Sequence, residues 1–132
     1  MIFLEIPIGD FFDKYSILCL KSERILDQNK LVDVIREKQY LESLMDDYRY
    51  VLQEECYKKL HYVNKRLWEI QDDMRECERL KCFDDRFNML AKDVNVLNDK
   101  RFMYKYEINK MTNSSYKEQK SYSEEYLRRK FS

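Results

Sequence analysis

The sequence predicts an all-α protein, a bundle of about four helices built from antiparallel coiled-coil-like hairpins. Three observations lead to this prediction. The 132 residues include one glycine and one proline, and both fall within the stretch IPIGDFFDKY. Charged residues make up 38% of the chain and hydrophobic residues 44%, a balance typical of long amphipathic helices. Apolar residues also recur at steps of three and four, the spacing of one helix face.

A single domain is expected over residues 1–132, because a chain of this length folds around one modest core. Within it we predict an extended N-terminal segment at residues 1–9 and a helical core at residues 10–111. Residues 112–132 are predicted to form a tyrosine-rich, charged tail. No internal repeat of 20–50 residues is visible.

The first helix is expected to begin at Asp10, whose carboxylate can accept hydrogen bonds from the free amides of the first turn. The stretch LDQNK then supplies Asp27, a turn and cap residue, before the second helix. Apolar positions in both helices keep helical spacing. They are Phe11, Tyr15, Leu18 and Ile25 in the first helix, and Val34, Leu41, Met45, Tyr48 and Leu52 in the second.

A change in the phase of the apolar pattern predicts a short turn near residues 53–56, between the second and third helices. One continuous helix from Leu31 to Leu80 is the alternative, since no glycine or proline interrupts this region. Asp84 is the expected cap of the fourth helix, which the stretch TNSS ends. In each of these two helices the apolar residues at steps of three and four form one packing face, which we call the seam. The seam residues are Leu60, Val63, Leu67, Ile70, Met74 and Cys77 in the third helix, and Phe87, Leu90, Val94, Leu97, Tyr104, Ile108 and Met111 in the fourth.

Arg101 stands where the seam of the fourth helix needs an apolar residue. A buried guanidinium requires a carboxylate partner, and Asp72 and Asp99 are the nearest candidates along the sequence. Polar stripes on the third and fourth helices would meet beside the seam of an antiparallel hairpin. The cluster would then be either an internal ion-pair network or a pocket for an anionic small molecule. Its candidate residues are Asn64, Trp68, Asp72, Arg75, Asn98, Asp99, Arg101 and Lys105.

Catalytic chemistry has little support, and we predict no catalytic residue, metal site or cofactor. The single histidine, His61, has no nucleophile near it in sequence, and its spacing to the cysteines fits no common zinc site. Glu69-x-x-Asp72 supplies only half of the carboxylate pairs with which helical nucleotide pyrophosphohydrolases hold magnesium. No glycine remains to build a phosphate-binding loop.

Basic and acidic residues balance at 25 each, so no overall field draws the chain onto nucleic acid or a membrane. We therefore expect neither partner. Residues 100–132 carry nine basic against four acidic side chains, which is a weak indication of an anionic partner. The four cysteines and the lack of a signal peptide favour a reducing, cytoplasmic location.

The stretches IPIGDFFDKYSIL, KSERI, VNKRLWEIQDDMRECE, LNDKR, KYEIN and EQKSY occur in the order found in an uncharacterised family of small helical domains. The chain resembles this family over nearly its whole length. The resemblance implies a setting beside bacterial glycosyltransferase and polysaccharide genes, or in marine phages and large DNA viruses, and it brings no activity. Because many matching positions are polar, Asp13 and Lys14 join the candidate site. We predict that PIGD brings Asp13 against Arg101.

These observations predict a non-enzymatic interaction or scaffold protein, of viral origin under one reading. It would self-associate, as a dimer, or bind another protein in the cytoplasm, which is the host cytoplasm for a viral chain. The alternative is a ligand-binding or catalytic accessory in sugar-nucleotide or glycan metabolism that uses the polar cluster around Arg101.

Overall fold

The computed structural model describes residues 1–114 of the chain. This part contains helices and no strand, which confirms the all-helical class. The predicted tail lies outside the described residues from position 115 onward. The elements are α1 (Ile8–Arg24), α2 (Gln28–Leu44), the 3₁₀-helix η1 (Asp46–Gln53), α3 (Glu55–Arg79) and α4 (Asp85–Thr112).

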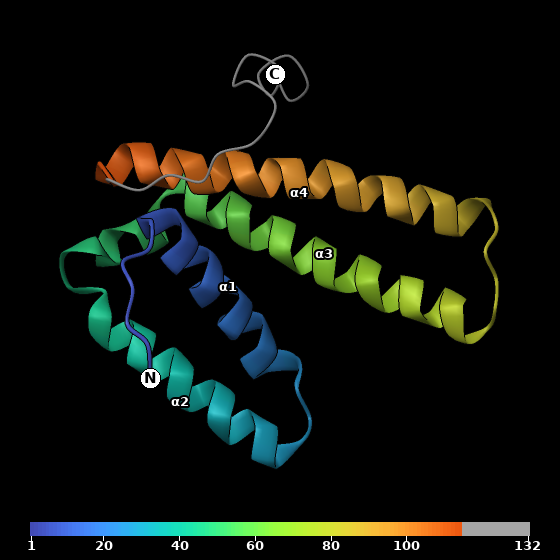
Figure 1. Cartoon of the computed structure of the whole chain (residues 1–132), viewed down its shortest axis with the longest axis horizontal. Coiled ribbons are helices and arrows are strands. Elements are labelled where there is room, and N and C mark those ends of the chain that lie inside the picture. The colour runs from blue at the N-terminus through green and yellow to red at the C-terminus, as the bar shows by residue number, and fades with distance from the viewer. Residues whose placement is uncertain (115–132) are drawn as a thin grey trace.

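The α-helices form two antiparallel pairs that meet at one end of the molecule and diverge toward the other (Figure 1). One pair is α1 with α2, and the other is α3 with α4. Helix α1 also packs against both α3 and α4, whereas α2 packs chiefly against α1. We call the meeting of α1, α3 and α4 the junction (residues 8–21, 60–71 and 98–109), and the far part of the second pair the distal hairpin (residues 72–97).

The main hydrophobic core lies where the two pairs meet. Its buried residues come from α1, α2, η1, α3 and α4, so this one cluster joins every helical element. The aromatic ring of Phe12 has no exposed surface and packs edge-on against Phe11 and Tyr57. The cluster consists of Phe12, Tyr15, Leu18, Leu41, Met45, Val51, Tyr57, Leu60 and Ile108.

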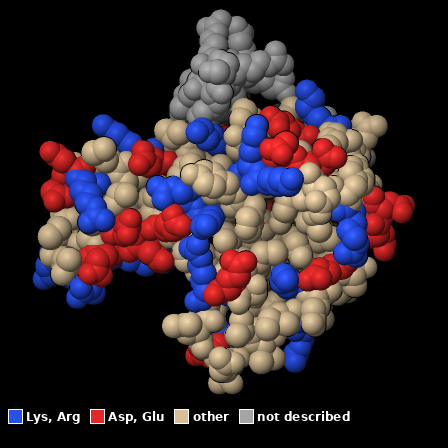
Figure 2. Space-filling view, turned by 180° about the vertical axis from the view of Figure 1, so that it is seen from behind, with Lys and Arg blue, Asp and Glu red and all other residues tan. Residues whose placement is uncertain are grey.

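The apolar seam predicted for the third helix is largely confirmed, since five of its six residues are buried. The prediction for the fourth helix is less accurate. Ile108 is fully buried, but Met111, in the last turn of α4, is exposed. The surface shows no single-sign region on the face seen in Figure 2, where positive and negative side chains are interspersed.

The predicted caps of two helices are present. Asp27 accepts hydrogen bonds from the amides of residues 29 and 30 at the start of α2, and Asp84 does the same for residues 86 and 87 of α4. The alternative of one continuous helix from Leu31 to Leu80 is wrong. Asp46 adopts a positive φ of 43° directly after α2, a conformation that ends an α-helix and that aspartate accepts more readily than most residues.

No helix among residues 1–114 has both the length and the apolar composition needed to cross a membrane.

Candidate functional site

The only glycine of the chain lies where the backbones of α1 and α4 touch. A Cβ atom built on Gly9 would lie 2.3 Å from the carbonyl oxygen of Lys105, far inside van der Waals contact. The amide of Gly9 donates to the Asn109 side chain at 2.7 Å, and the amide of Ile8 donates to the Ser114 hydroxyl at 3.2 Å. Side chains at the end of α4 therefore satisfy the first free amides of α1.

This arrangement corrects the prediction for Asp10. Helix α1 begins at Ile8, two residues earlier than expected, and no side chain of its own sequence caps it. Asp10 lies inside the first turn, where its carboxylate forms an ion pair with Lys105 at 2.9 Å. The side chain of Asn109, a hundred residues after Gly9, therefore takes the place of a local cap.

One turn further along α1, Asp13 forms a two-pronged ion pair with Arg101 of α4. The Arg101 Nε donates to Asp13 Oδ1 at 2.9 Å, and Nη2 donates to Oδ2 at 2.6 Å. The Asp13 side chain is only 8% exposed and that of Arg101 is 31% exposed. The predicted contact between Asp13 and Arg101 is therefore present, and its parallel geometry is the strongest that a carboxylate and a guanidinium form.

The ion pair continues into a buried hydrogen-bond network. The amide nitrogen of Asn64 on α3 donates to Asp13 Oδ1 at 3.0 Å and to Ser16 Oγ at 3.1 Å. Ser16 Oγ lies 2.8 Å from Nδ1 of His61. Asp13, Ser16 and Asn64 are buried, so the network links α1, α3 and α4 away from water.

The contact between Ser16 and His61 has the spacing of a nucleophile and its base, but its surroundings do not suit that chemistry. The Ser16 side chain has no exposed surface, so a substrate cannot reach its hydroxyl. Burial lowers the pKa of His61 below its usual value, which keeps the ring neutral at neutral pH. A neutral imidazole can share one hydrogen bond with a hydroxyl, and the pair acts as part of the network.

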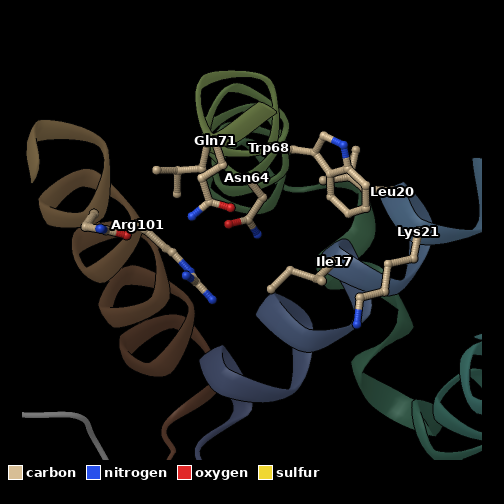
Figure 3. Close-up of a pocket in the computed structure, with 9 residues that line it drawn as sticks. Ile17, Leu20, Lys21, Asn64, Trp68, Gln71 and Arg101 are labelled. Carbon is tan, nitrogen blue, oxygen red and sulfur yellow. The ribbon is translucent and has the colours of Figure 1, made fainter. Parts of the chain in front are cut away.

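A cavity of about 230 Å³ opens beside this network, and we call it the junction cavity. Figure 3 shows Arg101 from α4, Asn64 from α3 and Lys21 from α1 around it. Four of the predicted site residues line this one space, namely Asn64, Trp68, Asn98 and Arg101. The complete lining is Ile17, Leu20, Lys21, Asn64, Leu67, Trp68, Gln71, Asn98 and Arg101.

The other predicted site residues do not line the junction cavity. Lys14 pairs with Glu37 of α2 at 2.9 Å, and Lys105 pairs with Asp10. Asp72 and Arg75 pair with each other at 3.2 Å on an exposed face of α3, so Asp72 is not the partner of Arg101. Asp99 is half-buried on α4 and is not among the lining residues.

Sequence reasoning missed the lining residues that α1 contributes. Ile17 and Lys21 follow Asp13 at steps of four, so all three lie on neighbouring positions of one helix side. The periodicity of α1 could have identified them, once Asp13 was placed against α4. Gln71 could have been found in the same way, because it lies seven residues, or two turns, after Asn64.

The cysteines are not gathered into one site. Cys56 and Cys77 lie about 30 Å apart along α3, given a rise of about 1.5 Å per residue. All four thiols are free, and burial raises the pKa of Cys19 and Cys56 above its usual value. Thiols with raised pKa values hold little thiolate at neutral pH, so they are weak nucleophiles.

Fold and site together define an all-helical domain with a buried polar junction and one small polar cavity beside it. The chain belongs to the family described as "Family of unknown function (DUF6165)", which matches residues 2–127. The match includes the N-terminal segment and every helix described above. No curated protein and no solved structure matches the chain.

Proposed function

We propose that this protein is a non-enzymatic interaction protein, and that it assembles with a second copy of itself through its N-terminal segment. The observation that carries this proposal is the exposure of that segment. Ile2, Phe3 and Leu4 are between 75% and 92% exposed, although all three are large and apolar. Contiguous exposed apolar side chains of this size are typical of interaction sites.

An apolar groove lies directly beside the segment, where the start of α1 meets the end of α2. Its volume is about 180 Å³, and Ile6 forms part of its wall, whereas residues 1–5 are not among its lining residues. The groove is lined by Ile6, Ile8, Phe11, Phe12, Leu44, Met45 and Tyr48. The N-terminal segment of each copy can bind in the apolar groove of the other copy, and this reciprocal contact produces a closed two-fold dimer.

The magnitudes favour a weak, reversible dimer. Full burial of a large apolar side chain stabilises by about 1.5–3 kcal/mol, so six such side chains in a symmetric pair contribute about 9–18 kcal/mol. The loss of freedom on association costs about 4–15 kcal/mol. These ranges overlap, and the dimer should therefore dissociate on dilution. Assembly with a different protein through the same segment is the alternative.

The cellular setting is part of this proposal and stays a prediction. The resemblance stated above supports a place beside polysaccharide-forming enzymes in bacteria, or in viruses. The cysteine content supports a cytoplasmic location, which is the host cytoplasm for a viral chain.

Sedimentation across a dilution series tests the proposal, with Leu4→Asp as the main variant. We expect the wild-type chain to shift from dimer toward monomer on dilution, and Leu4→Asp to be monomeric throughout. Leu26→Asp is the matched control, because Leu26 is 89% exposed in the turn after α1 and lies outside the groove. This variant should associate like the wild type.

Two results would contradict the proposal. One is a wild-type chain that remains monomeric at every concentration. The other is a Leu4→Asp variant that associates as strongly as the wild type, which would place the contact on another surface.

A further inference from the structure

We propose that the junction cavity is a binding site for a small carboxylate, a molecule with one carboxylate group on a compact body that carries hydroxyl or amide groups. This inference does not depend on self-association, because the cavity and the apolar groove share no residue. It rests on the charges, the polar atoms and the apolar wall of the cavity.

Two cationic side chains line the cavity. Arg101 is held by both oxygens of Asp13, so its guanidinium is fixed in place before a ligand arrives. Lys21 projects from α1 on the other side of the cavity (Figure 3) and makes no ion pair with any residue in the range 1–114. A ligand anion would therefore meet one pre-oriented guanidinium and one adjustable ammonium group.

The charge balance favours a single negative charge on the ligand. Among residues 1–114, the carboxylate of Asp13 offsets the charge of Arg101, and Lys21 gives the lining a net charge of +1. One carboxylate group neutralises this charge. A phosphate ester carries about −1.5 to −2 at neutral pH, so it would leave excess negative charge in a partly enclosed space.

Three amide side chains supply the polar contacts. Both amide hydrogens of Asn64 are used by Asp13 and Ser16, so its carbonyl oxygen is the only polar atom of this lining side chain that remains to accept from a ligand. Gln71 and Asn98 lie on the rim and can each donate and accept. This combination suits hydroxyl or amide groups, which also donate and accept.

One wall of the cavity is apolar, and Trp68 is its largest side chain. The guanidinium of Arg24, at the end of α1, lies 5.9 Å from the centre of the Trp68 ring of α3. This cation–π contact restrains the orientation of the indole. The volume of about 230 Å³ is below the range of about 300–1,000 Å³ typical of drug-sized ligands. The ligand should therefore be smaller than a nucleotide and have one apolar face.

Trp68 is the only tryptophan in the chain, so its fluorescence reports on this cavity without a label. We would titrate the wild-type protein with three monocarboxylates, namely lactate, pyroglutamate and glucuronate. Glucose and glucose 6-phosphate serve as the neutral and the phosphate counterparts of glucuronate. We expect a saturable change with at least one carboxylate. If glucuronate binds, glucose should bind at least about tenfold more weakly, because it lacks a charge-assisted hydrogen bond.

Lys21→Met tests the charge while it keeps most of the side-chain stem. The variant should unfold at the wild-type temperature, since Lys21 makes no ion pair or side-chain hydrogen bond within the described part of the chain. Its affinity for the bound carboxylate should fall at least about tenfold. Lys65→Met is the matched control, because Lys65 is exposed on α3 outside the cavity, and its affinity should not change.

Three results would overturn the proposal. The first is the absence of a saturable change with all three carboxylates. The second is a response in Lys21→Met equal to that of the wild type. The third is tighter binding of glucose 6-phosphate than of every carboxylate, which would assign the cavity to phosphate esters instead.

Discussion

At the junction the ion pairs that join α1 to α4 are largely shielded from water, whereas the closest ion pairs of the distal hairpin join residues of one helix and face solvent. Asp13 and Arg101 belong to α1 and α4, and their contact is largely buried. Asp72 and Arg75 are three residues apart on α3, and both are exposed. An aspartate–arginine ion pair therefore occurs in both regions, largely buried between two helices at the junction and exposed within one helix in the distal hairpin.

The difference shows which charges define the fold. An exposed ion pair is worth at most about 1 kcal/mol, because water solvates both groups almost as well. Removal of one member of a buried pair costs about 3–5 kcal/mol, since the other charge stays buried without compensation. Interspersed surface charges such as those in Figure 2 therefore contribute little to the fold, whereas the junction network joins α1 to α3 and α4.

The largest effect is expected for Asp13→Ala. This change leaves Arg101 and the amide of Asn64 without their shared acceptor, and we expect a loss of about 3–5 kcal/mol in the free energy of unfolding. Urea denaturation followed by circular dichroism measures it. A loss below about 1 kcal/mol would show that the junction pair is no stronger than a surface pair.

Gly9→Ala should have the next largest effect, about 1–3 kcal/mol of destabilisation, because the added methyl group collides with a backbone oxygen that cannot rotate away. Helix propensity alone predicts the opposite sign, a gain of about 1 kcal/mol. The sign of the change in denaturation midpoint therefore decides whether α1 and α4 are in close contact. Stabilisation would contradict the observed crossing.

His61 gives a smaller, pH-dependent effect. Burial lowers the pKa of His61 in the folded chain below its unfolded value of about 6.5, so protonation favours unfolding. The wild type should lose stability as the pH falls from about 7 to 5, and His61→Gln should lose less over this range, by under about 1 kcal/mol. Equal slopes in thermal melts of both proteins would remove His61 from the network.

The smallest effect is expected in the distal hairpin. Arg75→Ala breaks the exposed pair with Asp72 and should change the free energy of unfolding by less than about 0.5 kcal/mol. The same urea denaturation measures it. A loss of 2 kcal/mol or more would mean that the surface pairs of this hairpin also hold the fold.

Local features of this structure could be predicted from the sequence. The caps at Asp27 and Asp84 involve amides two or three residues away, and the buried seam of α3 follows directly from helical spacing. The interruption of a seam by Arg101 also located the polar site, because an arginine in an apolar stripe requires a partner.

Contacts between distant segments could not be predicted in the same way. Helical spacing places Asn109 on the same face of α4 as Arg101 and Lys105, but it does not indicate that the partner of Asn109 is the amide of Gly9, a hundred residues away. The break at Asp46 lacks a glycine or proline signal, because an aspartate adopts the left-handed conformation there. Ser16 also looks like an ordinary helix residue until α3 places Asn64 and His61 against it.

The most direct test of the junction is a double-mutant cycle with Asp13→Ala and Arg101→Ala, measured by urea denaturation. If this pair joins α1 to α4, the two losses should be non-additive, with a coupling energy of about 1–3 kcal/mol. The same cycle on Asp72 and Arg75 should give less than about 0.5 kcal/mol. Strict additivity at Asp13 and Arg101, with both single variants destabilised, would contradict the account.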